Sequence, residues 1–364
     1  MKHIFKQLHL WLSLPAGLLL VVLCLTGAVL VFQSDIQQWL SRQARSVTVP
    51  PGARPLPLDT LVAVSQREAQ AAGKSVSGLT VYADANRAWD VSVAGRKGPF
   101  LTIDPYTARV TGRGTPGEDF FGAVRGLHRW LLLDNRAVGR CVMGISTLSL
   151  LVILVSGLAV SLPRSWRQWR EFLTLRCGRK AFLFWFTSHR ALGWYALLFL
   201  FLMAATGPMW SFPWYRDGVA RVFGVYEPRK DGVKKERKGR EAPPAPAPPV
   251  ATWSVALENV RRAAPDYTSV RLRAGEAMVR SPRDVHQQAS DTYRFDRRGR
   301  ITEIQRYADL PASRKVMHYA KLLHFGTWGG WVTKVLYFLA CLAGVHLTLS
   351  GYWLYIYRQR RRCR

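Results

Sequence analysis

Acidic residues and cysteines are scarce in this chain. Its 364 residues include 23 Asp and Glu against 52 Lys and Arg, a formal net charge of +29, and five cysteines. The sequence contains no C-x-x-C, so it supports neither dithiol redox chemistry nor covalent haem attachment through C-x-x-C-H. No cysteine lies in the two long polar segments, so we expect no disulfide framework there and interpret the cysteines as packing residues.

Motifs for nucleotides, zinc and nucleic acids are also missing. The sequence has no G-x-G-x-x-G, P-loop, H-E-x-x-H or Cys/His cluster at zinc-ligand spacing. No RRM, zinc-finger or helix-turn-helix pattern accompanies the basic charge, so no nucleic-acid partner is expected. The positive charge lies beside long apolar runs, which favours a role in orienting the chain in a membrane.

Four long apolar runs predict four helices that cross membrane lipid. Each run exceeds the roughly 20 residues needed to cross about 30 Å of hydrocarbon. The first run is too long for the apolar region of a signal peptide, and no small-residue cleavage site follows Phe32, so we predict a retained helix. The runs are about Leu8–Phe32, Val138–Leu162, Phe182–Phe212 and Trp331–Tyr357.

Short basic flanks predict the orientation of these helices. Lys2 and Lys6 precede the first run, a basic loop at 164–181 joins the second and third, and Arg358 begins a basic tail. Such flanks stay in the cytoplasm. We therefore expect a multi-pass protein of the bacterial inner membrane with both termini cytoplasmic and both long polar segments periplasmic.

An internal repeat is the most informative feature of the sequence. The order His, helix, Thr-Gly, polar segment, Leu-His, helix, Ser-Gly occurs twice. The two copies are His9, Thr26-Gly27, Leu127-His128, Ser156-Gly157 and His189, Thr206-Gly207, Leu323-His324, Ser350-Gly351. Such repeats usually pack about a pseudo-twofold axis. The sequence thus predicts a mainly α membrane protein, a four-helix transmembrane bundle built from a tandem repeat.

Each polar segment is predicted to fold as a small α+β unit, with one helix against a short antiparallel sheet. Helical patterns occur at about 58–72 and 252–263, and alternating strand patterns follow each of them. The predicted strands are Gly78–Ala83, Ala88–Val93, Phe100–Val110 with a turn near Asp104, Ser269–Arg273, Asp291–Asp296 and Ile301–Tyr307. A Pro-rich linker at 242–250 is predicted to be extended.

The repeat histidines fall into two pairs by topology. His9 and His189 lie near the cytoplasmic ends of helices one and three, and His128 and His324 near the outer ends of helices two and four. Neutral imidazole pairs between helices can provide both axial ligands of a b-type haem. His346 lies in the inner half of the fourth helix without a repeat counterpart, and could replace His9 beside His189. Intramembrane ionisable groups are costly and usually functional, which favours ligands over interfacial histidines.

Aromatic residues close the third helix on its outer side. Two interpretations of Trp210, Trp214 and Tyr215 stay open: an interfacial aromatic belt, or a platform where a substrate rests beside the outer haem. The glycines of the Thr-Gly and Ser-Gly pairs are expected to allow close helix packing or to leave room for a macrocycle.

Several of these motifs occur together in a known family. They are His9 with Thr26-Gly27, Leu127-His128-Arg129, His189-Arg190-Ala191-Leu192-Gly193 with Thr206-Gly207, and Leu323-His324-Phe325-Gly326. With them the chain resembles the PepSY-associated transmembrane proteins over nearly its whole length. The stretch Ile103–Thr107 resembles the closing hairpin of a PepSY module, although Ala108 stands where the family usually has Gly. The resemblance implies two PepSY-like periplasmic domains.

The family includes iron-regulated inner-membrane proteins and ferric-siderophore reductases with two b-type haems. The resemblance therefore implies an oxidoreductase that passes electrons across the membrane to a ferric siderophore or other ferric chelate and releases Fe(II). The donor would be a quinol or a cytoplasmic flavin reductase, because the chain lacks the flavin domain that many relatives carry. Two alternatives remain: a non-redox PepSY module that binds or regulates a periplasmic peptidase, and a haem-b electron-transfer subunit for a separate periplasmic enzyme.

These expectations assign ligands and divide the chain. The outer haem would use His128 and His324, and the inner haem would use His189 with His9 or His346. The expected parts are helix one at 1–34, the first periplasmic domain at 35–125, helix two at 126–163, the cytoplasmic loop at 164–181, helix three at 182–213, the second periplasmic domain at 214–322, helix four at 323–357 and the tail at 358–364.

Overall fold

The computed structural model describes residues 2–95, 98–163, 165–176, 181–226, 250–286 and 289–362. Residues 242–249 of the predicted linker lie outside these ranges, as do Arg164 and 177–180 of the predicted basic loop and the last two residues of the tail. The chain divides into two compact units. The helical unit comprises Met1–Ser34, Asp119–Tyr226 and Val316–Arg364, and the sheet unit comprises Asp35–Glu118 and Glu227–Lys315.

Four helices of the helical unit are long and apolar enough to cross a membrane, which confirms the four predicted spans. They are α1 (Lys2–Val31), α6 (Arg136–Ser161), α8 (Ala181–Thr206) and α14 (Gly330–Arg362). Both α1 and α14 extend into basic flanks, because helical backbone bonding continues where the side chains turn polar. Helix α8 ends at Thr206 and the chain continues as α9 (Pro208–Ser211), since Pro208 has no N–H to donate back along the helix.

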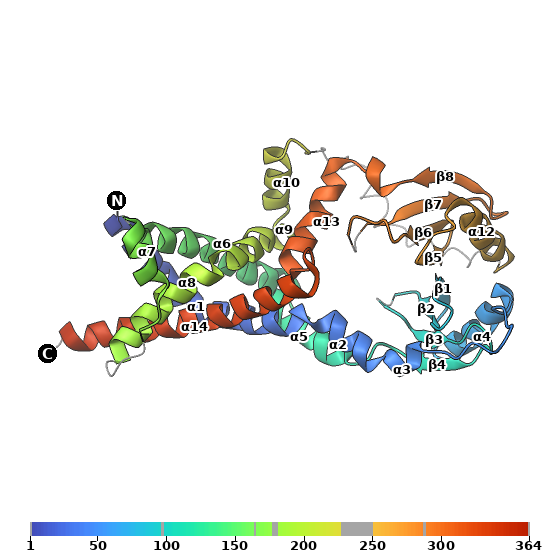
Figure 1. Cartoon of the computed structure of the whole chain (residues 1–364), viewed down its shortest axis with the longest axis horizontal. Coiled ribbons are helices and arrows are strands. Elements are labelled where there is room, and N and C mark those ends of the chain that lie inside the picture. The colour runs from blue at the N-terminus through green and yellow to red at the C-terminus, as the bar shows by residue number, and fades with distance from the viewer. Residues whose placement is uncertain are drawn as a thin grey trace. The chain divides into compact units, whose positions relative to one another are not determined.

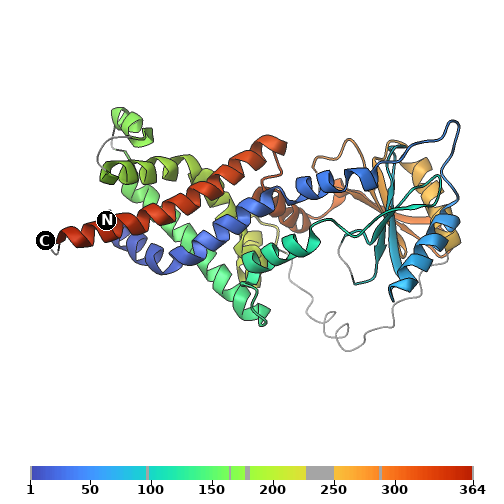
Figure 2. The ribbon, with the colours of Figure 1, turned by 90° about the horizontal axis from the view of Figure 1, so that it is seen from below.

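Each repeat contributes two neighbouring helices to the helical unit. Helix α1 lies against α6 and α14, and α8 lies against α14 and α6. Figure 2 shows α1 and α14 side by side, with both chain termini at one end, which we call the terminal end. The opposite end of this unit holds α5 (Glu118–Trp130) and α13 (Ala312–Phe325), which precede α6 and α14 (Figure 1).

Small residues let these helices approach closely. Gly17 of α1 lies under the ring of Tyr352 on α14, whose hydroxyl donates to the carbonyl of Leu14 at 2.6 Å. Gly344 of α14 similarly faces Cys24 of α1, where an added Cβ would lie 2.6 Å from the sulfur. Cys24 is buried and unpaired, as expected of a packing residue.

Short helices complete the described chain. They are α2 (Gln33–Leu40), α3 (Arg42–Arg45), α4 (Leu58–Ala71), α7 (Trp166–Leu173), α10 (Pro213–Val222), α12 (Val250–Ala263) and a 3-10 turn at Tyr307–Asp309. Asn135 caps α6, because its side-chain oxygen accepts from the backbone N–H of Ala137 at 3.1 Å.

The sheet unit contains one eight-stranded antiparallel sheet. Its strands are β1 (Val76–Tyr82), β2 (Trp89–Val93), β3 (Leu101–Ile103), β4 (Val110–Arg113), β5 (Ser269–Arg273), β6 (Glu276–Arg280), β7 (Asp291–Phe295) and β8 (Ile301–Gln305). The order β4-β3-β2-β1-β5-β6-β7-β8 places the first strands of the two polar segments side by side. In this pair Leu79 faces Leu272 and Val81 faces Val270. The two predicted α+β units therefore share a single sheet and a single core.

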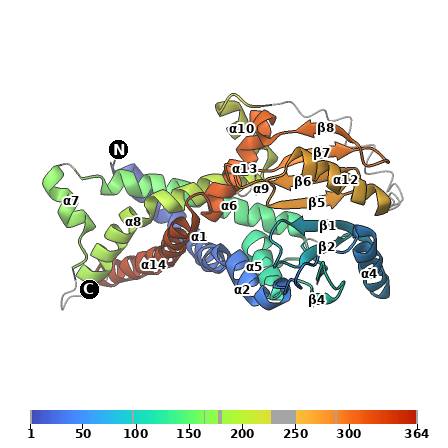
Figure 3. The same cartoon turned by 45° about the vertical axis from the view of Figure 1, so that its right-hand side comes forward.

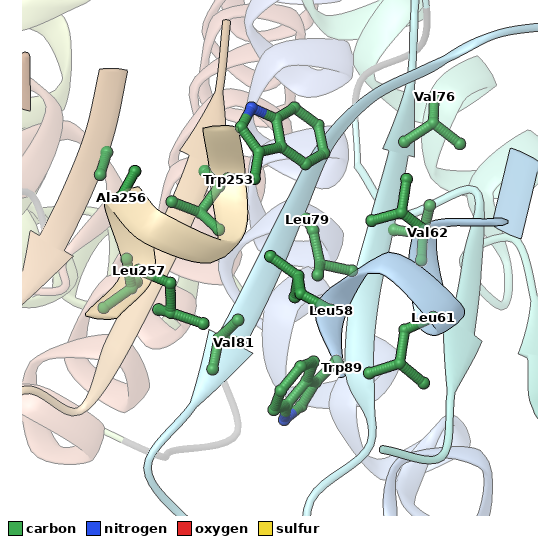
Figure 4. Close-up of a cluster of buried hydrophobic side chains, with 14 of the residues drawn as sticks. Leu58, Leu61, Val62, Val76, Leu79, Val81, Trp89, Trp253, Ala256 and Leu257 are labelled. Atoms are coloured by element: carbon green, nitrogen blue, oxygen red, sulfur yellow. The ribbon is translucent and has the colours of Figure 1, made fainter. Parts of the chain in front are cut away.

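Helices α4 and α12 cover one face of this sheet (Figure 3). Alternate strand residues point towards them, as period-2 patterning requires. Figure 4 shows Leu61 of α4 and Leu257 of α12 on the same side of β1, where Leu79 and Val81 face them. The Ser254 hydroxyl of α12 donates to Asp59 of α4 at 3.0 Å, which joins the two helices directly.

The turn predicted near Asp104 is confirmed, and one strand was missed. Strands β3 and β4 flank this turn, which Asp104 closes by accepting from the Tyr106 N–H at 2.8 Å and from the Thr107 hydroxyl at 2.7 Å. Ala108 in this turn has φ +56°, a conformation that favours the glycine usual in the family. Strand β6 was not predicted, although Gly275 with φ +72° provides the tight turn that leads into it.

Candidate functional site

The four repeat histidines form two pairs within the helical unit. The rings of His9 on α1 and His189 on α8 have centroids 6.4 Å apart and lie nearly perpendicular, at 86°. The rings of His128 on α5 and His324 on α13 also have centroids 6.4 Å apart, at 63°. Each pair therefore joins equivalent positions of the two repeats. The His9–His189 pair lies towards the terminal end of the unit and the His128–His324 pair towards the opposite end.

Of the two partners considered for His189, the structure brings His9 and not His346 into ring contact with it. His346 lies one helical turn before Ser350 on α14, and its Nε2 is 3.0 Å from the hydroxyl of Ser188. The imidazole of His346 also stacks on Trp185, with centroids 5.4 Å apart and planes at 12°. His346 is therefore held apart from the two pairs.

Hydrogen bonds from Nδ1 fix the tautomer of the paired rings. In His9 and His324 the acceptor is a backbone carbonyl, of Ile153 and Met203. Leu23 and Leu347 hold the equivalent positions beside His128 and His189, whose Nδ1 atoms bond the hydroxyls of Thr26 and Ser350. The Nδ1–O distance is 2.9 Å at His9 and 3.1 Å at His324. Because a carbonyl only accepts hydrogen bonds, Nδ1 must carry the proton. Nε2 then keeps its lone pair, which is the form in which imidazole binds a metal.

A hydroxyl on the neighbouring helix, three residues after the carbonyl residue, also supports each ring. His128 Nδ1 donates to Thr26 Oγ1 at 2.8 Å, and Thr26 in turn donates to the carbonyl of Val22 at 2.6 Å. The other three hydroxyls also donate within their own helices and accept from the imidazole. The equivalent contacts are Ser156 with His9 at 3.3 Å, Ser350 with His189 at 2.8 Å and Thr206 with His324 at 3.0 Å.

The glycine after each hydroxyl residue leaves space for the same imidazole. A Cβ added to Gly157 would lie 3.0 Å from Cε1 of His9, which is too close without movement of the ring. At the other three glycines the distance from an added Cβ to Cε1 would be longer. These distances are 3.7 Å from Gly27 to His128, 3.5 Å from Gly207 to His324 and 3.6 Å from Gly351 to His189. Each Ser-Gly or Thr-Gly pair is therefore a seat for one histidine, formed by a carbonyl, a hydroxyl and a missing side chain.

The electrostatic environment keeps His128 and His324 neutral. They lie on α5 and α13, outside the four candidate spans. Burial, together with the neighbouring His324, lowers the pKa of His128 to about 3. Burial lowers the pKa of His324 to about 4. Both imidazoles are therefore unprotonated on Nε2 at neutral pH, as a metal ligand must be.

The spacing of each pair suits one metal ion between two imidazoles. With metal–nitrogen bonds of about 2.0 Å, two axial imidazoles on one iron have ring centroids about 6 Å apart. Within the described residues, no group of three or more His, Cys, Asp or Glu could hold a metal ion. A pair of neutral imidazoles without further protein ligands fits haem iron, whose other four ligands come from the macrocycle.

The aromatic residues after α8 lie at the His128–His324 end. Trp210 packs against His324 with ring centroids 5.0 Å apart and stacks on Phe325 at 8°. Trp214 is 64% exposed and contacts Tyr215. The Tyr215 hydroxyl donates to the carbonyl of Ala205 at 2.8 Å, which holds the turn after α8. Only Trp210 of the three candidate substrate residues touches a paired histidine.

Sequence reasoning did not assign a role to the hydroxyls and carbonyls that hold the histidines. The pattern that could have revealed them is the repeated Ser-Gly or Thr-Gly pair, which was interpreted as helix packing or space for a macrocycle. A hydroxyl placed three residues after a carbonyl on a helix faces the same side, so the pair could have been recognised as a seat for an imidazole. The rings of Trp185 and Trp353 beside His346 were also not singled out.

Comparison with known families agrees with the repeat. The profile described as PepSY-associated TM region matches residues 6–358, which include both histidine pairs, all four spans and the sheet unit. No curated protein matches the chain.

Proposed function

This chain belongs to the family of PepSY-associated transmembrane proteins, and we propose that it is a haem-b oxidoreductase of the bacterial inner membrane. In this proposal it binds two haems, one between His9 and His189 and one between His128 and His324. It passes electrons across the membrane to a ferric siderophore or related ferric chelate.

The observation that carries the proposal is the shared construction of the two histidine pairs. Nδ1 of each imidazole is hydrogen-bonded to a carbonyl or to a hydroxyl that itself donates elsewhere, so Nε2 keeps its lone pair in both rings of each pair. A helix anchor has no need of such an arrangement. Hydrogen bonds from the far nitrogen of a ligating histidine orient its ring and raise its basicity. The same seats occur at both ends of the helical unit, which supports two cofactors and a path between them.

The residues of the chain position the cofactors and the substrate. When bound, haem supplies a one-electron couple at its iron. The carbonyl and hydroxyl of each seat hold the imidazole plane, and the buried helices exclude water from it. Trp210 beside His324 offers an aromatic face where a ferric chelate can rest. One electron converts the bound Fe(III) to Fe(II), which hard oxygen ligands hold less tightly, so the metal is released.

Charge supports the proposed orientation. Lys2 and Lys6 at the start of α1 and Arg358, Arg360 and Arg361 at the end of α14 lie together at the terminal end. Short basic flanks stay in the cytoplasm. The His9–His189 pair would then be the inner one and the His128–His324 pair the outer one, with the sheet unit in the periplasm.

Haem counting tests this function. Detergent-purified protein should show the reduced-minus-oxidised bands of b haem at about two haems per chain. His128→Ala and His324→Ala should each leave one haem, whereas His346→Ala should keep both. Dithionite-reduced protein should be reoxidised by ferrioxamine. A flat spectrum from haem-replete cells, or loss of haem in His346→Ala alone, would contradict the proposal and leave a PepSY module that acts on a periplasmic peptidase.

A further inference from the structure

His346 breaks the symmetry of the repeat. The equivalent residue of the first repeat is Val152, five residues before Gly157 as His346 is five before Gly351. Both positions are partly exposed on the outside of the helical unit. Ser188, which bonds His346, has Leu8 as its counterpart. One half of the molecule therefore places a polar group within a membrane span where the other half has only hydrocarbon, and such groups usually serve a function.

Hydrogen bonding defines which nitrogen of His346 is available. The Ser188 hydroxyl donates to the carbonyl of Trp185 at 3.2 Å, so it accepts from His346 Nε2 at 3.0 Å. Nε2 then carries the proton, and Nδ1 has a lone pair. No hydrogen bond to this Nδ1 occurs within the part of the chain that the structure describes. An acceptor without a donor is costly in hydrocarbon, so this nitrogen calls for a donor from outside the chain.

A row of flat rings continues from His346 towards the terminal end. Trp185 stacks on His346. The ring of Trp353 lies 5.7 Å from that of Trp185, with the planes at 28°, and the ring of Tyr357 lies 5.1 Å from that of Trp353, with the planes at 17°. All these rings are half-exposed. The counterparts of Trp353 and Tyr357 in the first repeat are Ala159 and Pro163. Trp185 has an aromatic counterpart, Phe5, but the row beyond it belongs to one half only.

We propose that His346 and this aromatic row bind the headgroup of a quinol from the membrane. A quinol is planar, lives in hydrocarbon and carries a hydroxyl that can donate to Nδ1. Its ring can stack on the face of an indole, as aromatic pairs do. Lipid acyl chains offer neither a donor nor a flat ring. The inference rests on the proposed function, because it identifies the electron donor for the inner haem.

The position of His346 also suits this role. Ser188 and His189 are adjacent on α8, and His346 and Ser350 are one turn apart on α14, so the quinol site adjoins the seat of His189. Oxidation of one quinol breaks two O–H bonds, forms two C=O bonds and releases two electrons and two protons. Haem held by His9 and His189 would accept these electrons one at a time. One proton goes to His346 Nδ1 and then to water, and the other goes directly to water.

The test measures quinol binding and haem content separately on the full-length protein in nanodiscs. Binding of decylubiquinol, which carries the donor hydroxyl, is followed by quenching of tryptophan fluorescence in anaerobic samples whose haem is already reduced. Haem reduction by decylubiquinol is measured separately on oxidised protein. His346→Val, which installs the residue of the first repeat, should weaken binding by about tenfold or more through loss of one hydrogen bond. Haem content and reoxidation by ferrioxamine should not change. Leu342→Val, one turn away on the exposed side of α14, is the matched control and should bind normally.

The outcomes separate the two proposals. Equal quinol binding by the wild type and His346→Val, with haem retained in both, would overturn the quinol site and leave the reductase intact. A chain without haem would overturn the reductase, while quinol binding could still be measured. His346→Gln keeps an acceptor, so it should recover part of the binding, which distinguishes a lost hydrogen bond from a misfolded helix.

Discussion

Gly157 lies closer to an imidazole than the glycines of the other three histidine seats. A methyl group there would meet Cε1 of His9 at 3.0 Å and Nδ1 at 3.2 Å, whereas at Gly351 it would meet only His189, at 3.6 Å. A distance of 3.0 Å would force the His9 ring to move, whereas 3.6 Å to His189 is ordinary van der Waals contact. The two positions are equivalent in the repeat, so they form a matched pair.

We therefore predict that Gly157→Ala weakens the proposed inner haem site and Gly351→Ala does not. Displacing His9 from the Ile153 carbonyl removes the hydrogen bond that orients the ligating ring, and the loss of such bonds costs about 10- to 100-fold in metal affinity. Haem per chain after purification and the midpoint potential of the inner haem are the measurements. Equal haem retention by both variants would show that the seat tolerates the ring in another position.

The sequence could not decide whether His9 or His346 pairs with His189, for a physical reason. Both histidines lie at a similar depth, and periodicity alone does not fix how each helix is rotated about its axis. Rotation is decided by packing, here by contacts such as Tyr352 over Gly17. The pairing of His128 with His324 was predicted from the sequence, because both stand at the same place in the repeat, directly after a Leu and before the second helix of each copy.

At the scale of helices, the contact of α1 with α14 depends on the absence of a side chain at Gly17. An added Cβ would lie 2.7 Å from Cζ of Tyr352, and the Tyr352 hydroxyl is tied to Leu14. We predict that Gly17→Ala destabilises the helical unit by about 1–3 kcal/mol, the usual cost of overpacking. Thermal unfolding in detergent measures this.

Gly193→Ala is the control for that experiment. Gly193 lies on α8, and its added Cβ would meet Leu347 at 3.7 Å, which is normal van der Waals contact. Its melting temperature should be equal to or slightly above that of the wild type, because alanine favours a helix. A melting temperature lowered equally in both variants would mean that α1 and α14 are not held by this contact.

The helices and most strands were predictable because their signals are local. Apolar runs longer than a bilayer and alternating strand patterns need no knowledge of the rest of the chain. The pairing of β1 with β5 joins residues nearly two hundred positions apart, such as Leu79 and Leu272, and nothing local in either strand specifies it. Strand β6 was missed because it is short and follows β5 after a tight turn at Gly275.

At the scale of the whole molecule, the shared sheet makes the two polar segments one folding unit. Leu272 is fully buried among residues from both segments, including Leu79. We predict that Leu272→Ala, at a cost of about 2–5 kcal/mol, raises hydrogen exchange in β1–β4 as well as in β5–β8. Faster exchange confined to β5–β8 would show two independent modules.

Ile304→Ala in β8 is the control, since Ile304 is an aliphatic residue that is 44% exposed in the strand at the sheet edge. It should change exchange only near β7 and β8. The comparison separates a cooperative effect through the core from local loosening.

The junction of β1 with β5 has a consequence for how such a molecule could arise. A chain holding only one repeat would leave its first strand as an open sheet edge and each of its histidines without an opposing ring. A second copy of the same chain would complete both, because the missing strand and the missing histidines are the equivalents of those it already has. The protein in this sense has the architecture of a homodimer joined into one polypeptide, and the joining allows the two halves to differ, as they do at His346 and Val152.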